Sequence, residues 1–214
     1  MIHYIQNLKI RLKLYILIGV ALFGMLLISG MSFFLMGQMN EMTSDIATSW
    51  LPSVDIGREL SNTISNIRLN ELGYLTAMSD DMEKSSLQYL QSEKEDMEAL
   101  LATYGALIDE EERDFYHNAL NFWTQYKETD ERIMALAAQG RIEDAREILD
   151  GECVGLYNSL NSAFDQIITY NTQGSDDAAE ESASLYRTAV CVMAGIVLAV
   201  ILVGVFFSFV VIRL

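Results

Sequence analysis

Arg68 is the side chain in this sequence best suited to binding a small anion. Its planar guanidinium can hold a carboxylate through two parallel, charge-assisted hydrogen bonds, as an amino acid or organic acid ligand requires. Glu71 follows three residues later. A second group of polar side chains, much further along the chain, could complete such a site: Tyr157, Asn158, Asn161 and Asp165.

Arg68 also has purely structural interpretations, which the sequence leaves open. It could pair with Glu71 on one helix face, because residues three apart are neighbours there. It could reach Asp165 instead. Its aliphatic stem could also cover Ile64 and Leu72 at the edge of an apolar stripe.

These residues can meet only if the two segments that carry them run antiparallel. Residues 37–187 contain a single proline and no alternating apolar and polar stretch typical of a strand. Apolar residues instead recur at helical spacing in four segments. The sequence therefore predicts an all-α, antiparallel up-down four-helix bundle. Aligning residue 37 with about residue 187 places Arg68 opposite residue 156.

Capping signals predict where the helices begin and end. Ser79 is a candidate N-cap for the second helix, and Asp109 with Glu112 predicts a capping box at the start of the third. Gly140 has the position of a C′ glycine. Residues 141–152 are then predicted to form a short helix that ends at Gly151, with the fourth long helix beginning near residue 152.

Pro52 is the only proline in the chain and lies inside the predicted first helix. A proline within a helix removes one backbone hydrogen bond, at a cost of about 3 kcal/mol. We predict a kink or a loosened turn here, with Trp50 filling the space beside it.

Two uncharged segments predict helices that are continuous with the bundle and span a membrane. Each exceeds the roughly 20 apolar residues needed to cross the hydrocarbon layer, and is too long for the core of a signal peptide. The predicted organisation is a cytoplasmic N-terminus (1–13), a first span (14–36), an extracytoplasmic domain (37–187), a second span (188–212) and the start of a cytoplasmic part (213–214).

The charge distribution predicts the orientation. Lys9, Arg11, Lys13 and Arg213 flank the spans, so both termini are expected in the cytoplasm. The outer segment holds all 30 acidic residues but only 10 of the 14 basic ones, a net charge of −20. This surface excludes binding to nucleic acid or anionic lipid. The acidic surface could serve to attract cations or amines, or it could simply be a solvated exterior, and the sequence leaves both interpretations open.

No catalytic constellation is present, so we expect no enzyme activity and no cofactor. The sequence has no phosphate-binding loop, no His-Glu-x-x-His and no serine or cysteine with a nearby histidine and acid. His117 beside Asp114 and Asn121 has a spacing that would bind a metal only weakly, and we predict no metal site. Asn171 falls on the apolar stripe of the fourth helix, where a polar residue usually fixes register or partner number.

The segment Trp50-Leu51-Pro52-Ser53, with Arg68 and Glu71 after it and GRIEDAREIL at residues 140–149, resembles the sensor region of methyl-accepting chemotaxis proteins. The aspartate and serine receptors are similar more distantly. The resemblance covers essentially the whole chain. It implies a homodimer, in a bacterial inner membrane, paired through its first helices. It also implies binding of an amino acid, organic acid, amine or solute-loaded binding protein between the first and fourth helices, and signalling by a small slide of the fourth helix.

The sequence stops at VVIRL, where the cytoplasmic linker of such a receptor would begin. We therefore expect a fragment of a longer receptor or a truncated product. The same kind of sensor heads histidine kinases and diguanylate cyclases, so an input domain of either is an alternative function. A truncated decoy receptor that only dimerises is another.

Overall fold

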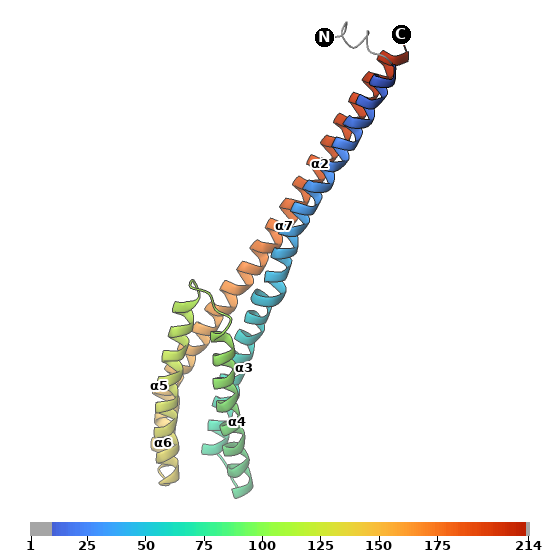
Figure 1. The fold of residues 1–214 in the computed structure, drawn as a ribbon. Helices are drawn as coiled ribbons and strands as arrows, with labels where there is room; N and C mark the ends of the chain where they lie inside the picture. Colours follow the sequence, from blue (N-terminus) through green and yellow to red (C-terminus); the bar gives the residue numbers. More distant parts are fainter. Residues whose placement is uncertain (1–9, 213–214) are drawn as a thin grey trace. The chain divides into compact units, whose positions relative to one another are not determined.

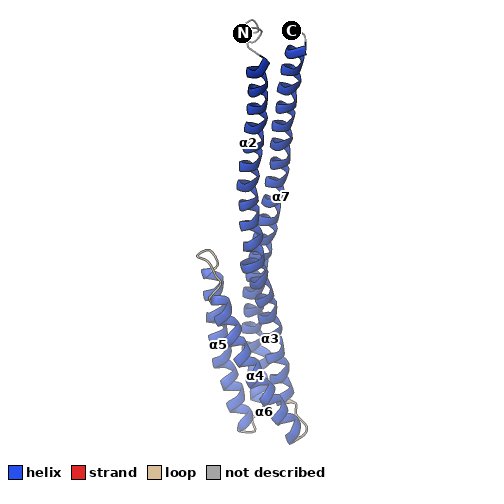
Figure 2. Ribbon diagram, turned by 45° about the vertical axis from the view of Figure 1, so that its right-hand side comes forward, coloured by secondary structure: helices blue, strands red, loops and turns tan. Residues whose placement is uncertain are grey.

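The apolar spacing produces helices throughout the part of the chain that the computed structural model describes, residues 10–212. The all-α prediction is confirmed, and residues 10–212 contain no strand (Figure 2). Residues 1–9 and 213–214, including Lys9 and Arg213 of the charge argument, lie outside the described residues. The elements are α2 (Ile10–Asp45), η1 (Ile46–Trp50), α3 (Leu51–Leu75), α4 (Asp80–Gly105), α5 (Arg113–Ala138), α6 (Ile142–Ile148), η2 (Leu149–Cys153) and α7 (Val154–Ile212).

The bundle occupies the unit Ile46–Asp176, which lies within the predicted outer domain. Tight turns reverse the chain between α3 and α4, between α4 and α5, and between α5 and α6 (Figure 1). The fourth long helix of the bundle is the first part of α7. Successive reversals make neighbouring helices antiparallel, as the sequence predicts.

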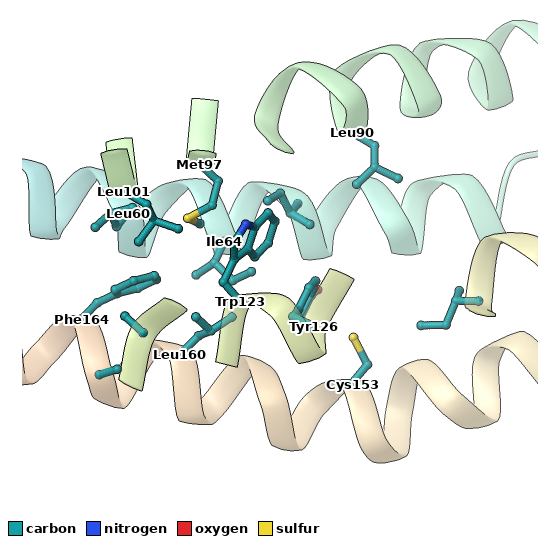
Figure 3. Packing of buried hydrophobic residues seen from close by; sticks show 14 of the residues in the cluster. Leu60, Ile64, Leu90, Met97, Leu101, Trp123, Tyr126, Cys153, Leu160 and Phe164 are labelled. Carbon is teal, nitrogen blue, oxygen red and sulfur yellow. The ribbon is translucent and has the colours of Figure 1, made fainter. Parts of the chain in front are cut away.

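The core of this unit consists of apolar side chains three, four or seven residues apart on each helix (Figure 3). This spacing places them on one face of each helix. Fully burying a large apolar side chain contributes roughly 1.5–3 kcal/mol. The principal members are Leu60, Ile64 and Ile67 on α3, Leu90, Met97, Leu101 and Tyr104 on α4, Ala119, Trp123, Tyr126 and Ile133 on α5, and Leu160, Phe164 and Ile167 on α7.

The second unit combines Met1–Asp45 with Asp177–Leu214. Within its described residues, α2 and the end of α7 are each long and apolar enough to span a membrane. Their large apolar side chains point outward, for example Phe33 at 79% and Val205 at 63% exposure. Such side chains suit a lipid environment. Gly24 lets the two helices approach closely, since a Cβ there would lie 2.6 Å from Val200 Cγ2.

The proline confirms the predicted loosened turn. Pro52 lies at the start of α3, directly after the π-helical turn η1. Proline has no N–H to donate to the preceding turn, so the wider π spacing is a direct accommodation. Trp50, the last residue of η1, fills space against α7: its ring lies 5.9 Å from that of Tyr170 and next to the backbone of Gly174.

Gly174 is the residue that admits this indole. A Cβ at position 174 would lie 2.4 Å from Trp50 Cζ3. We expect Gly174→Ala to destabilise the full chain by about 1–3 kcal/mol through overpacking, and to change the Trp50 fluorescence. Gly155→Ala on the same helix is the matched control, because nothing lies within 4 Å of its added Cβ. That change should stabilise by about 0.4–1 kcal/mol in a thermal melt, and a similar response from both variants would contradict the close packing.

The predicted helix caps are present, with one boundary shifted. Ser79 Oγ accepts a hydrogen bond from the Met82 N–H at 3.4 Å. Asp109 Oδ1 accepts from the Glu112 N–H at 3.0 Å, and Glu112 Oε2 accepts from the Asp109 N–H at 3.4 Å. These are the reciprocal bonds of the predicted capping box. The regular helix α5 nevertheless begins only at Arg113.

The two glycines near the third turn behave differently from one another. Gly140 has φ of 75° and closes α5, since its N–H donates to Ala137 O and the next N–H, of Arg141, donates to Leu136 O. This is the predicted C′ role. The prediction that a helix ends at Gly151 is wrong. Gly151 lies inside the π-helical turn η2, which joins α6 to α7 without a break, because a wider turn accommodates the glycine within continuous helix.

Candidate functional site

Arg68 lies at the seam between α3, η2 and α7. Its guanidinium carbon is 5.5 Å from the centroid of the Tyr157 ring, so the predicted antiparallel register is confirmed to within one residue. Nη1 donates to the backbone oxygen of Leu149 at 3.3 Å, and Nη2 lies 4.0 Å from Asp150 Oδ1. The Arg68 side chain is 16% exposed and Asp150 is 62% exposed. Of the alternatives, the ion pair is therefore made with Asp150 rather than with Glu71 or Asp165.

The backbone oxygen that Arg68 contacts belongs to Leu149, the first residue of the π-helical turn η2. In a π turn the backbone hydrogen bonds join residues five apart instead of four, so each carbonyl group pairs with a different N–H than in an α-helix. Leu149 O accepts from Arg68, and the guanidinium has five N–H donors in all. The Asp150 contact is long and largely solvated. A carboxylate from solution could therefore replace Asp150 without disturbing the bond to Leu149.

The structure brings only part of the predicted set to this seam. Tyr157 lies under Arg68, and its hydroxyl is 3.1 Å from Ser65 Oγ on α3. Asn161 donates from Nδ2 to Tyr157 O at 3.2 Å, so its amide is directed along α7. Asn158 is exposed and lines a groove toward α5 instead. Asp165 is exposed.

Glu71 is completely buried and does not face the same solvent-accessible space as Arg68. Its Oε2 accepts a hydrogen bond of 2.7 Å from the Tyr126 hydroxyl, and Cys153 Sγ lies 4.0 Å from the same oxygen. Tyr126 in turn stacks on Trp123 with 6.0 Å between ring centroids. A solute could reach Glu71 only by opening the core.

An ion pair between a partly exposed lysine and a buried aspartate lies beside Glu71. Lys94 Nζ on α4 contacts Asp130 Oδ2 on α5, and Asp130 is 1% exposed. Sequence reasoning missed this pair. A usable signal was present, since Asp130 lies four residues after Tyr126 and three before Ile133, on the apolar stripe of α5.

A second buried polar cluster links α7 to the turn before α5. Asn171 Nδ2 donates to Glu112 Oε1 at 2.5 Å and to Ile167 O at 3.0 Å, and the Tyr104 hydroxyl donates to the same Glu112 oxygen at 2.5 Å. Burial and the neighbouring Glu112 carboxylate raise the pKa of Tyr104, so its phenol stays protonated and acts as a donor. The predicted structural role of Asn171 fits these contacts.

Three surface grooves of the bundle have volumes in the range of small-molecule sites. One, of about 470 Å³, lies between α5 and α7 and has neutral polar walls. Another, of about 510 Å³, continues along the same seam past the Arg132–Glu152 ion pair. The third, of about 420 Å³ between α3 and α4, has acidic walls that include Glu59, Glu93 and Asp96.

Comparison with known proteins identifies the kind of module. Residues 7–186 match the family model described as a four helix bundle sensory module for signal transduction. A protein named as a sensory transducer from Acetivibrio thermocellus is 27% identical over 128 residues. That alignment covers 57% of this chain and 23% of the relative. The chain therefore matches less than a quarter of that relative's length.

Proposed function

Since the chain belongs to the family of four-helix-bundle sensory modules for signal transduction in chemotaxis-type receptors, we propose that it is the ligand-binding input of a two-pass bacterial receptor. The bundle lies outside the cytoplasm, both termini lie inside, and the module works as a homodimer in the inner membrane. A solute or a solute-loaded binding protein is the stimulus. The output is a displacement of α7 along its own axis.

One observation carries this proposal. Helix α7 runs from Val154 to Ile212 without interruption. Tyr157, which lies under Arg68, and the apolar stretch long enough to span a membrane therefore belong to one continuous helix. Helix shifts of about 1–2 Å are an established mode of switching, and an unbroken helix passes such a shift along its length.

The chemistry at the seam favours an anionic ligand. The Arg68 guanidinium has donors to spare beyond Leu149 O, and its partner Asp150 is largely solvated. A ligand carboxylate would bind through two parallel hydrogen bonds, with the Tyr157 ring on one side of the guanidinium. An amino acid or organic acid meets this requirement, whereas the acidic α3–α4 groove would favour an amine.

Replacing Arg68 tests this site. The full chain in detergent is screened by thermal shift against amino acids, organic acids and polyamines. A ligand at 100 times its Kd adds about 2.7 kcal/mol, and each kcal/mol moves Tm by roughly 2–4 °C in a protein of this size, so a shift of roughly 5–10 °C is expected. Arg68→Ala should abolish the shift produced by a carboxylate. Arg58→Ala, on the same helix and paired with Asp55 at the surface, should leave it unchanged.

The other outcomes separate the competing functions. A ligand shift that survives Arg68→Ala keeps the sensor but moves its site to one of the grooves. Absence of any shift, with the protein folded, would favour a binding-protein partner or the decoy receptor. Input to a sensor kinase or cyclase would use the same module, and this screen does not distinguish these outputs.

A further inference from the structure

Two carboxyl side chains from different helices meet in the core of the bundle. Glu71 on α3 is 0% exposed and Asp130 on α5 is 1% exposed. Tyr126 donates to one oxygen of Glu71, and Lys94 contacts one oxygen of Asp130. The remaining oxygens, Glu71 Oε1 and Asp130 Oδ1, are buried without a hydrogen-bond partner among the described residues. Native proteins leave few such atoms unsatisfied.

One proton would satisfy both of these oxygens. The two carboxyl groups are neighbours that act on each other electrostatically. Two ionised carboxylates are both acceptors and cannot hydrogen-bond to one another. A proton on Glu71 supplies an O–H that donates to Asp130. Glu71 is the better position for that proton, because Asp130 is already compensated by the Lys94 ammonium.

The charges around the pair favour the same assignment. Two carboxylates face one ammonium, which leaves one uncompensated negative charge in the core unless a proton is bound. Burial, and next the neighbouring Asp130, raise the pKa of Glu71 to about 8, against the opposing effects of Tyr126 and Lys94. The same surroundings, first burial and then Glu71, raise the pKa of Cys153 to about 12, so the thiol is neutral. The titratable and charged groups that face the pair are Lys94 on α4, Tyr126 on α5 and Cys153 on η2, while Arg68 on α3 acts on Cys153 and not on either carboxyl group.

We propose that the Glu71–Asp130 pair is a proton-binding site, and that release of its proton loosens the packing of α3 against α5 and η2. The stimulus is mildly alkaline pH. The ionised pair would place two like charges side by side in a low-dielectric interior, and opening to water relieves their repulsion. This site is separate from the Arg68 seam, so it does not depend on the proposed solute.

The direction of the pH dependence follows from the raised pKa of Glu71. The folded state holds its proton up to about pH 8, whereas the unfolded chain releases it near its ordinary pKa of 4.5. The folded bundle therefore binds more protons between these values. The stability contributed by the bound proton is fully present below about pH 4.5 and is lost as pH rises to about 8.

Cys153 reports the opening directly, because it is 0% exposed in the core (Figure 3) and its Sγ lies 4.0 Å from Glu71 Oε2. In a Cys191→Ser background it is the only thiol in the chain. The labelling rate of Cys153 with an uncharged maleimide is measured in the full chain in detergent, for the parent and for Glu71→Gln. Glutamine mimics the protonated acid and cannot ionise. Taking the ratio of the two rates at each pH cancels the ordinary titration of the thiol.

We expect this ratio to rise by up to about tenfold per pH unit between pH 6 and 8 and to level off above, as required when one proton is released on opening. A ratio that does not change with pH would overturn the proposal. If Glu71→Gln does not fold, Asp130→Asn replaces it as the reference, because its amide can donate to the ionised Glu71 and its repelling charge is gone.

Infrared spectroscopy supplies an independent readout. The parent at pH 6 should show the C=O stretching band of a protonated carboxylic acid, which disappears by pH 9.5. Glu71→Gln should lack this band at both values. A folded parent protein without the band at pH 6 would show that Glu71 is ionised, and would also overturn the proposal.

Discussion

Replacing Lys94 with methionine is expected to destabilise the full chain by about 3–5 kcal/mol at neutral pH. The Lys94 ammonium compensates the charge of Asp130, which is 1% exposed. The adjacent Glu71 carboxyl cannot take its place, because an ionised carboxylate has no hydrogen to donate. Removing one partner of a buried ion pair leaves an unpaired charge in a medium that solvates it poorly. In a protein of this size, the loss corresponds to a fall in Tm of roughly 6–20 °C.

Lys127→Met is the matched control for this change. Lys127 and Glu98 also join α5 to α4, at 2.6 Å, but their side chains are 37% and 57% exposed. An exposed pair contributes up to about 1 kcal/mol, and the position of Lys127 over the Trp123 ring adds a similar amount. The control should therefore cost less than about 2 kcal/mol. Equal losses for the two variants in thermal melts would contradict the importance of burial.

Local sequence signals predicted the architecture well, because each acts through nearest neighbours. The lack of an N–H on Pro52 disturbs the preceding turn whenever the residue lies in the interior of a longer helical segment. The positive φ of Gly140 and the reciprocal bonds of Asp109 and Glu112 have the same local character. Gly151 shows the limit of such signals. Whether a glycine ends a helix or is taken up in a π turn depends on how the following segment packs.

The candidate site was less predictable, because it depends on which way each side chain faces. The antiparallel register alone predicted that Arg68 would meet Tyr157. Glu71, only three residues from Arg68, instead continues the buried series of Ile64 and Ile67 on α3. The hydroxyl that donates to this buried acid belongs to Tyr126 on α5, and no single-helix pattern reveals a partner 55 residues away.

The two buried polar clusters have different consequences for movement of α7. The Glu71 cluster contacts η2 through Cys153, at the start of α7. The Glu112 cluster holds α7 much further along, through Asn171. A slide of about 1–2 Å would move Asn171 relative to Glu112 and lengthen or bend the 2.5 Å bond between them. This bond therefore opposes translation of α7.

Glu112→Leu is accordingly expected to cost about 1–3 kcal/mol of folding free energy. The change leaves the Tyr104 hydroxyl without its 2.5 Å acceptor and removes the shorter bond of the Asn171 amide. Each buried donor left unsatisfied costs about 1–3 kcal/mol. Thermal or denaturant unfolding of the full chain measures the loss. Glu112→Gln retains an acceptor oxygen at this position and should recover part of it.

A double-mutant cycle with Tyr104→Phe separates this network from a simple loss of packing. Phenylalanine removes the donor that depends on Glu112 but keeps the ring against Tyr116. Glu112→Leu should then cost about 1–3 kcal/mol less in the Tyr104→Phe background than in the parent, because one unsatisfied donor is gone. Additive losses would mean that the bond between Tyr104 and Glu112 contributes nothing measurable, and that the loss in Glu112→Leu comes from packing or from the bond to Asn171.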